Sequence, residues 1–216
     1  MNKAVIFDLD GTLLDTLPDL HENCNLMLEH FGFPKVDKEK VRLSIGNGAT
    51  KLVERILGEN YDPAKFEEHF KYYSKLYDDS KSNKTNFFDG IPTVLTEFKK
   101  RGYKLAICTN KPQTPTDNVC EKYFKEFGFD LAVGLSDNVK RKPDPQATLN
   151  ILEKLGVEKQ NACFVGDGET DVMTAINAGI KCVSVLWGYR EKEVLQQAGA
   201  EVFAKNPLDL LNLINL

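Results

Sequence analysis

The chain has 216 residues, of which 42% are hydrophobic and 28% are charged, and its formal net charge is −4. This balance provides enough apolar side chains for a folded core and no general attraction to nucleic acid or to an anionic membrane. No basic and apolar leader and no apolar run of ~18 residues is present, so we expect a cytoplasmic protein with no membrane or nucleic-acid partner. Five cysteines without a CxxC pair predict buried, reduced thiols.

The first predicted element is a short apolar strand, Ala4–Phe7, and helical spacing of apolar residues follows it. Asp37 is suited to cap a short helix, and Asp62-Pro63 has the residue types of a helix N-terminus. Residues 78–86 are polar and are interpreted as a linker. The segment 16–86 therefore predicts a small all-helical unit, with helices expected at 18–31, 38–44, 49–57 and 63–77.

Beyond residue 87, predicted helices and strands alternate. The helices are expected at 91–101, 116–127, 145–155, 169–178, 191–198 and 207–214, and the strands at 103–108, 129–134, 162–165, 182–186 and near 202–203. Alternation of this kind predicts an α/β, Rossmann-like parallel sheet with helices on both faces. Residues 1–15 and 87–216 would form this core, and residues 16–86 would be a helical cap inserted after the first strand. Ligands of such sheets bind beyond the carboxyl ends of the strands, where an inserted unit could act as a lid.

Two carboxylates, Asp8 and Asp10, follow the first strand and are two residues apart, so they face the same side of an extended chain. Like charges ~4 Å apart repel by about 4 kcal/mol at an effective dielectric of about 20, and a cation or a shared proton would relieve this. Oxygen ligands of this kind suit Mg²⁺, and the backbone amides from Leu9 to Gly11 could bind an anion. The combination suggests phosphoryl chemistry, although Asp and Gly are also common in ordinary turns.

Three further polar clusters follow strand-like runs. Thr109 and Asn110 offer uncharged hydrogen-bonding groups for a phosphate oxygen, or for a helix cap. Lys142 lies in the stretch RKPDP, where it could stabilise charge during transfer or belong to a solvated loop. Asp167 and Asp171 are four residues apart, about one helical turn, so both could face one pocket, although Asp is also an ordinary cap at a helix start.

In this order, the strings FDLDGTLLD, CTNKP, RKPDP and VGDGETD resemble the four motifs of the haloacid dehalogenase-like hydrolases. The resemblance covers residues 1–15 and about 87–216. It implies a Mg²⁺-dependent phosphatase in which Asp8 is the nucleophile and forms an aspartyl-phosphate. Asp10 would be the general acid for the leaving alcohol and then the base for the hydrolytic water.

The same resemblance assigns the binding residues. Asp8, the Asp10 carbonyl and Asp167 would hold Mg²⁺, and Asp171 would support these ligands and orient Lys142. Lys142 would also offset the charge of the phosphoryl group. The phosphoryl oxygens would be bound by Thr109, Asn110 and the amides around Leu9 and Gly11.

The inserted segment is similar to that of phosphoglycolate phosphatases in Val41–Ala49 and Leu52–Leu57, as is Trp187–Tyr189 in the core. This resemblance favours 2-phosphoglycolate as the substrate, with a small-molecule phosphate ester as the partner and a monomer or homodimer as the assembly. A glycine-rich turn in the insertion could read the substrate or could simply connect two helices. Its residues are Gly46, Asn47 and Gly48.

Other readings of the same motifs stay open. Within the family, Asp10 argues against a dehalogenase, which normally lacks this second acidic residue, but a β-phosphoglucomutase-like sugar-phosphate mutase, a pyrophosphatase and a nucleotidase are alternatives. A phospho-receiver signalling domain also combines an acidic Mg²⁺ pocket with a Thr and a Lys. Against it stand the helical insertion and the acid at Asp10, which would promote turnover. A receiver would retain its aspartyl-phosphate, whereas a phosphatase would release phosphate repeatedly.

Overall fold

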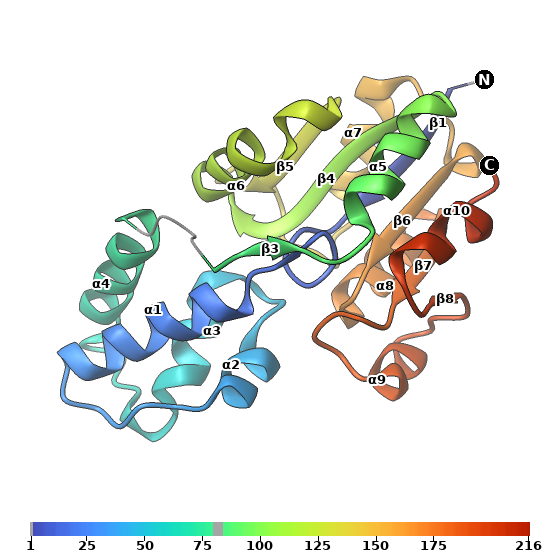
Figure 1. The fold of residues 1–216 in the computed structure, drawn as a ribbon. Helices are drawn as coiled ribbons and strands as arrows, with labels where there is room; N and C mark the ends of the chain where they lie inside the picture. The colour runs from blue at the N-terminus through green and yellow to red at the C-terminus, as the bar shows by residue number, and fades with distance from the viewer. Residues whose placement is uncertain (1, 80–83) are drawn as a thin grey trace. The chain divides into compact units, whose positions relative to one another are not determined.

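The computed structural model describes residues 2–79 and 84–216 (Figure 1). It consists of two compact units. The first comprises Met1–Leu14 and Phe87–Leu216, and the second comprises Asp15–Asn86. In the described residues, none of the helices combines the length and the apolar character that a membrane crossing needs.

The first unit is built on a six-stranded sheet in the order β5-β4-β1-β6-β7-β8. All five neighbouring pairs are parallel, as predicted. The strands are β1 (Lys3–Phe7), β4 (Tyr103–Pro112), β5 (Leu131–Leu135), β6 (Ala162–Gly166), β7 (Lys181–Val185) and β8 (Phe203–Ala204). The helices are α5 (Ile91–Lys100), α6 (Gln113–Val119), α7 (Gln146–Leu155), α8 (Glu169–Ala178), α9 (Lys192–Gln197) and α10 (Leu210–Leu213).

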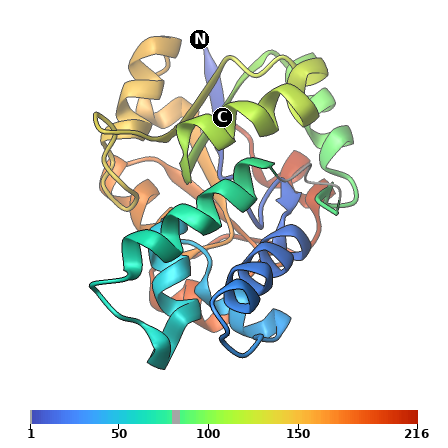
Figure 2. The ribbon, with the colours of Figure 1, turned by 90° about the vertical axis from the view of Figure 1, so that its left-hand side faces the viewer.

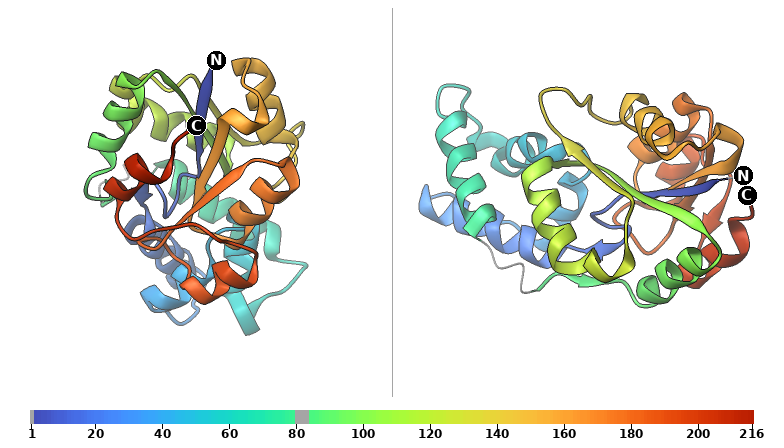
Figure 3. Two further views of the ribbon diagram at one scale, coloured as in Figure 1. Left: turned by 90° about the vertical axis from the view of Figure 1, so that its right-hand side faces the viewer. Right: turned by 90° about the horizontal axis from the view of Figure 1, so that it is seen from above.

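Side-chain alternation along β1 explains why helices cover both faces of this sheet. Val5 and Phe7 pack into one apolar cluster with residues of α5 and α10. Ala4 and Ile6 pack into a second cluster with residues of α7 and α8. These four side chains of β1 are fully buried, and Figure 3 shows the sheet between these two layers of helices. The α/β fold class predicted from the alternating pattern is therefore confirmed.

In its described residues, the second unit contains four α-helices: α1 (Leu17–His30), α2 (Lys38–Ser44), α3 (Gly48–Leu57) and α4 (Phe66–Asp79). As predicted, Asp37 caps α2, because its side chain accepts a hydrogen bond from Lys40 N at 2.7 Å. Helix α1 packs against α2 and α4, and α3 packs against α2 and α4 (Figure 2). The residues buried in this unit include Cys24, Met27, Leu28, Leu52, Val53, Ile56, Leu57 and Tyr73.

Strand β4 is longer than predicted. The sequence predicts that it ends at Cys108, but it runs to Pro112, which pairs with Leu135 of β5. The pairing is irregular between Cys108 and Pro112, so the strand passes through a distorted stretch and then resumes. Strand β4 therefore includes Thr109, Asn110 and Lys111, which lie near its carboxyl end.

Two helix predictions were wrong in detail. The segment predicted as one helix at 116–127 consists of the end of α6, a π-helical turn at Cys120–Phe124 and a 3₁₀ turn at Lys125–Phe127. Helix α4 begins at Phe66 rather than beside Asp62-Pro63, because Asp62 accepts bonds from Ala64 N and Lys65 N in a separate turn. Part of the predicted linker at 78–86 belongs to α4, and residues 80–83 lie outside the described residues.

Two short strands were not predicted. Strands β2 (Leu14–Asp15) and β3 (Asn86–Phe87) form a separate two-stranded sheet. Each is two residues long, which is too short to show a period of alternation in the sequence. The boundary between the two units falls within each of these strands.

A buried carboxylate ties the two ends of the second unit together. Asp19, on α1, accepts hydrogen bonds from Thr85 N at 2.7 Å, from Thr85 Oγ1 at 2.5 Å and from Lys84 N at 3.3 Å. Asp19 is 6% exposed and Thr85 is 4% exposed. One side chain therefore satisfies three donors on the segment that leaves the unit.

We expect Asp19→Ala to lower the free energy of unfolding by about 1.5–3 kcal/mol, because it leaves the buried Thr85 donors without their charged acceptor. Glu22→Ala is the matched control on the same helix, since Glu22 forms an exposed ion pair with Lys84 and its replacement should cost less than ~0.5 kcal/mol. Urea denaturation measures both. Equal stability of the two variants would mean that Asp19 does not hold the ends of the unit.

Candidate active site

The predicted site residues lie where the direction of strand order reverses. Strand β1 lies between β4 and β6, and the chain builds the sheet outward from it first on one side and then on the other. Open α/β sheets bind ligands at this point, beyond the carboxyl ends of the strands. Asp8 directly follows β1, Thr109 lies in the distorted end of β4, and Asp167 directly follows β6.

Lys142 is the centre of the charged cluster. Its Nζ donates to Asp171 Oδ1 at 2.6 Å and lies 2.9 Å from Asp8 Oδ1. The Lys142 side chain is 3% exposed, so both ion pairs are shielded from water. Asp171 is anchored again by its other oxygen, Oδ2, which accepts a hydrogen bond from Gly168 N at 2.9 Å. The role of Asp171 in orienting Lys142 stays a prediction, and these contacts are the ones on which it depends.

Asn110 fixes the backbone that carries Lys142. Its Oδ1 accepts a hydrogen bond from Lys142 N at 2.9 Å, and its Nδ2 donates to Lys142 O at 3.3 Å. The Asn110 side chain, which was predicted to bind phosphate, thus fixes the loop that contains Lys142. Next to it, Thr109 is buried and its Oγ1 accepts a hydrogen bond from Lys111 N at 3.3 Å. The Thr109 hydroxyl retains its own proton for donation.

Asp167 is held by two residues that the sequence did not single out for this purpose. Thr12 Oγ1 donates to Asp167 Oδ1 at 3.0 Å, and Tyr189 N donates to Asp167 Oδ2 at 2.8 Å. Trp187 Nε1 donates to Thr12 O at 3.0 Å and so ties the loop after β1 to the loop after β7. The resemblance to phosphoglycolate phosphatases included Trp187–Tyr189 but did not predict this contact. A hydrogen bond from the Tyr189 backbone amide cannot be predicted from the type of side chain at that position.

Two glycines let the backbone approach Asp167 closely. A Cβ at Gly188 would overlap the Cβ of Asp167, and a Cβ at Gly11 would overlap its carboxylate. Gly11 also has a φ of +88°, which side-chain-bearing residues rarely adopt. The Gly11 amide donates to Leu14 O at 2.9 Å, so its predicted contact with phosphate would require this bond to be exchanged. Leu9 O accepts the amides of residues 12–14 and closes the same turn.

Lys111 is a charged residue of this region that the sequence analysis did not assign. Its Nζ donates to Asp10 Oδ1 at 2.8 Å and to Asp10 Oδ2 at 2.9 Å. The Lys111 side chain is 4% exposed and the Asp10 side chain is 14% exposed. The signal was present, because Lys111 follows Thr109-Asn110 in the same motif, but strand β4 was expected to end before it.

Burial is the largest influence on the pKa values of Asp8 and Asp167. It raises the pKa of Asp8 to about 6, although the Lys142 ammonium opposes this shift. Burial, followed by repulsion from Asp8 and Asp171, raises the pKa of Asp167 to about 8. For Lys142, burial alone lowers the pKa, but the attraction of Asp171 and Asp8 outweighs it and raises the pKa above the usual range. The site is therefore short of positive charge.

The donor set fits a divalent cation. Oxygens of Asp8, Asp167 and Asp171 lie within 4.8 Å of one another. Asp8 Oδ1 is buried and accepts no hydrogen bond of good geometry, although the Lys142 ammonium lies beside it. Carboxylate oxygens are hard ligands that suit Mg²⁺. Both oxygens of Asp167 and both oxygens of Asp171 accept hydrogen bonds. One donor to Asp171 is the Lys142 ammonium, whose positive charge opposes a cation beside it, so Asp167 is a better candidate than Asp171 for a direct ligand.

The glycine-rich turn lies in the second unit. Gly46-Asn47-Gly48 connects α2 to α3, with φ values of +111° and +81° at the two glycines. Asn47 Oδ1 accepts a hydrogen bond from Arg55 Nη2 at 2.8 Å, and Arg55 Nη1 donates to Ser44 O at 3.1 Å. Arg55 therefore fixes the shape of this turn, and its predicted contact with substrate stays a prediction.

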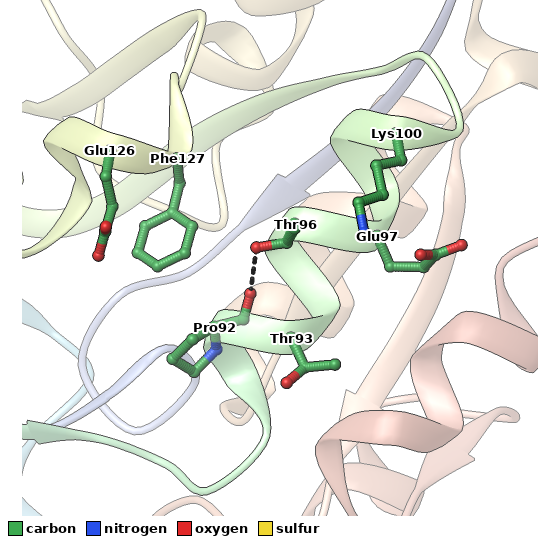
Figure 4. Close-up of a pocket in the computed structure, with 7 residues that line it drawn as sticks. All are labelled: Pro92, Thr93, Thr96, Glu97, Lys100, Glu126 and Phe127. Carbon is green, nitrogen blue, oxygen red and sulfur yellow. Dashed lines mark hydrogen bonds between the residues drawn. The ribbon is translucent and has the colours of Figure 1, made fainter.

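A pocket of about 420 Å³ lies elsewhere in the first unit, between α5 and the turn at Lys125–Phe127 (Figure 4). The side chains that line it are Pro92, Thr93, Thr96, Glu97, Lys100, Glu126 and Phe127. Thr96 Oγ1 donates to Pro92 O at 2.9 Å, within its own helix. The pocket shares no residue with the charged cluster and offers a phosphate ester no comparable set of groups.

Comparison with known proteins agrees with this geometry. The family model of haloacid dehalogenase-like hydrolases matches residues 5–185. Phosphoglycolate phosphatase 1 of Pseudomonas aeruginosa is 33% identical over 97% of this chain and 78% of its own length. The phosphoglycolate phosphatase of Aliivibrio fischeri is 29% identical over 99% of this chain and 97% of its own length.

A solved structure from Lactobacillus delbrueckii subsp. bulgaricus, provisionally named a phosphoglycolate phosphatase, superposes with a TM-score of 0.89. It is 28% identical, and the match covers 97% of each chain. Together these relatives support an enzyme that hydrolyses phosphoric monoesters. On the strength of the family match over most of its length, the chain belongs to the haloacid dehalogenase-like hydrolases.

Proposed function

We propose that the chain is a Mg²⁺-dependent phosphatase that hydrolyses 2-phosphoglycolate through an aspartyl-phosphate on Asp8. The observation that carries this proposal is the buried Oδ1 of Asp8 with the Lys142 ammonium 2.9 Å from it, at the reversal point of the sheet. The names of the relatives support the substrate.

In the first step, a carboxylate oxygen of Asp8 attacks phosphorus and the bond from phosphorus to the leaving alcohol oxygen breaks. The alcohol oxygen takes a proton from the carboxyl group of Asp10. The products of this step are glycolate and the aspartyl-phosphate. Asp8 is suited to this role because its Oδ1 is buried and accepts no hydrogen bond of good geometry, while the Lys142 ammonium lies 2.9 Å from it.

In the second step, a water molecule attacks the phosphorus of the aspartyl-phosphate. Asp10, now a carboxylate, takes the proton of the water, and the bond from phosphorus to Asp8 breaks. Inorganic phosphate leaves and the Asp8 carboxylate is restored. One residue serves as acid and then as base, so each turnover returns Asp10 to its starting form.

Lys142 and Thr109 would bind and stabilise the phosphoryl group during both steps. The Lys142 ammonium lies against the Asp8 oxygen and offsets negative charge as phosphorus is transferred. The Thr109 hydroxyl can donate to a phosphoryl oxygen without adding charge. Asn110 would act mainly by holding the Lys142 backbone, as its two hydrogen bonds indicate.

Asp8, the Asp10 carbonyl and Asp167 would hold Mg²⁺, and Asp171 would support them. When bound, the cation supplies charge neutralisation and polarises a phosphoryl oxygen. The surrounding residues of this chain set the position of its ligands: Thr12 and the Tyr189 amide fix Asp167. Gly46, Asn47 and Gly48 are retained as predicted substrate contacts.

The first test measures phosphate release from 2-phosphoglycolate and from a panel of sugar phosphates, nucleotides and pyrophosphate, with Mg²⁺ and with chelator. We expect selective turnover of 2-phosphoglycolate that chelator abolishes and that Asp8→Asn lowers by roughly 10⁴- to 10⁶-fold, as for the removal of other nucleophiles. Asp117→Asn is the matched control, because Asp117 is an exposed carboxylate that accepts a hydrogen bond from Gln113.

The outcomes separate the alternatives. Turnover that peaks on another ester would keep the mechanism and exclude the substrate. A single, long-lived acyl-phosphate without turnover would favour a signalling receiver. Full activity of Asp8→Asn would exclude Asp8 as the nucleophile.

A second test addresses the residues that position the metal ligand. Thr12→Val keeps the side-chain shape but removes the hydrogen bond to Asp167, so the Mg²⁺ concentration for half-maximal activity should rise about 10-fold or more. Thr174→Val is the control, because the hydroxyl of this buried threonine donates to Thr170 O within α8. An unchanged Mg²⁺ requirement in Thr12→Val would contradict the proposed role of Thr12 in positioning Asp167.

A further inference from the structure

The ion pair between Lys111 and Asp10 is not used by the mechanism above. Lys111 Nζ donates to both oxygens of the Asp10 carboxylate, at 2.8 and 2.9 Å. The lysine side chain is 4% exposed. A lysine held so far from water loses hydration and rotamer freedom, and burial of this kind is rare for lysine unless it is paired. Asp10 would also need one of these oxygens to contact a leaving group.

The position of Lys111 relates it to the leaving group rather than to the phosphoryl group. In the proposed function an Asp10 oxygen lies within hydrogen-bond reach of the leaving oxygen. The Lys111 ammonium is one hydrogen bond away from that same carboxylate. It is therefore about two hydrogen-bond lengths, roughly 6 Å or less, from the leaving oxygen.

Lys142, a second buried lysine in the described part of the chain, contacts the opposite side of the site. Lys142 contacts Asp8 and Asp171, both on the side of the nucleophile and the predicted metal ligands. Lys111 and Lys142 thus divide the site: one ammonium lies by the nucleophile and the other by the predicted acid. An additional negative charge on the alcohol part of a substrate would fall on the side of Lys111.

We propose that Lys111 binds a carboxylate on the leaving group and so selects phosphate esters of 2-hydroxy acids. In such an ester the carboxylate carbon is two bonds from the leaving oxygen, so its oxygens are close enough to that atom to reach the ammonium. The substrate carboxylate replaces one Asp10 oxygen on Lys111, and the released Asp10 oxygen faces the leaving oxygen. Lys111 is then a specificity-determining residue. This inference rests on the proposed function and identifies the substrate carboxylate as the group that the site recognises.

The test compares two esters that differ only in the group read by Lys111: 2-phosphoglycolate, which carries a carboxylate, and 2-hydroxyethyl phosphate, which carries a neutral hydroxyl in its place. We expect Lys111→Met to lower kcat/KM for 2-phosphoglycolate about 10- to 100-fold more than for 2-hydroxyethyl phosphate, the range for loss of a hydrogen bond to a charged group. Lys111→Arg should keep part of the preference because it keeps the charge.

Lys104→Met is the matched control. Lys104 lies near the start of the same strand, β4, and pairs with Asp130. Its replacement should leave the ratio between the two esters as in the unmodified protein. Equal loss of activity on both esters in Lys111→Met would assign Lys111 a structural role on Asp10 alone and would overturn the inference.

A binding measurement keeps the inference separate from the proposed function. Calorimetry would compare both esters on Asp8→Asn and on Asp8→Asn/Lys111→Met. Tighter binding of 2-phosphoglycolate that disappears in the double variant supports the inference even if the unmodified protein turns over a different ester best. If Asp8→Asn binds both esters equally, Lys111 does not read the carboxylate, whatever the chain hydrolyses.

Discussion

Lys142 holds together two carboxylates, Asp8 and Asp171, that would otherwise repel each other at the buried end of the sheet. At ~4 Å and an effective dielectric of about 20, such repulsion amounts to about 4 kcal/mol, a substantial part of the stability of an ordinary domain. Much of the surrounding structure serves this pairing. Asn110 fixes the Lys142 backbone from β4, and Gly168 anchors Asp171 from the start of α8.

Close packing around the acidic groups complements this charge arrangement. A Cβ at Gly166 would overlap Asp171, as one at Gly188 would overlap Asp167. The carboxylates are thus placed against bare backbone, which excludes water and leaves them few alternative rotamers. This confinement keeps their oxygens directed at one small volume, and the same confinement raises the pKa of Asp167.

The features that the sequence predicted are of two kinds: periodic patterns of apolar residues, and charged residues whose type indicates their chemistry. Alternating apolar strands and helices predicted the parallel sheet, and Ala4–Phe7 packs into both apolar layers as that pattern requires. The motif carboxylates and Lys142 were also identified. What escaped prediction depends on long-range geometry: Tyr189 acts through its amide, Thr12 reaches a residue far along the chain, and Lys111 depends on the distorted extension of β4. The start of α4 was misplaced because Asp62 has an equally good local partner in a turn.

The pairing of β2 with β3 brings the point where the chain enters the helical unit next to the point where it leaves. Asp19 closes that unit on itself through Thr85. The ends of this segment are adjacent, and hydrogen bonds within it join its first helix to its last residues. It can therefore be replaced as a unit, because the replacement needs only two junctions and leaves the strand order of the sheet intact. Recombination at Leu14–Asp15 and Asn86–Phe87 is therefore a direct route by which one catalytic sheet can acquire a different helical unit, in evolution or by engineering.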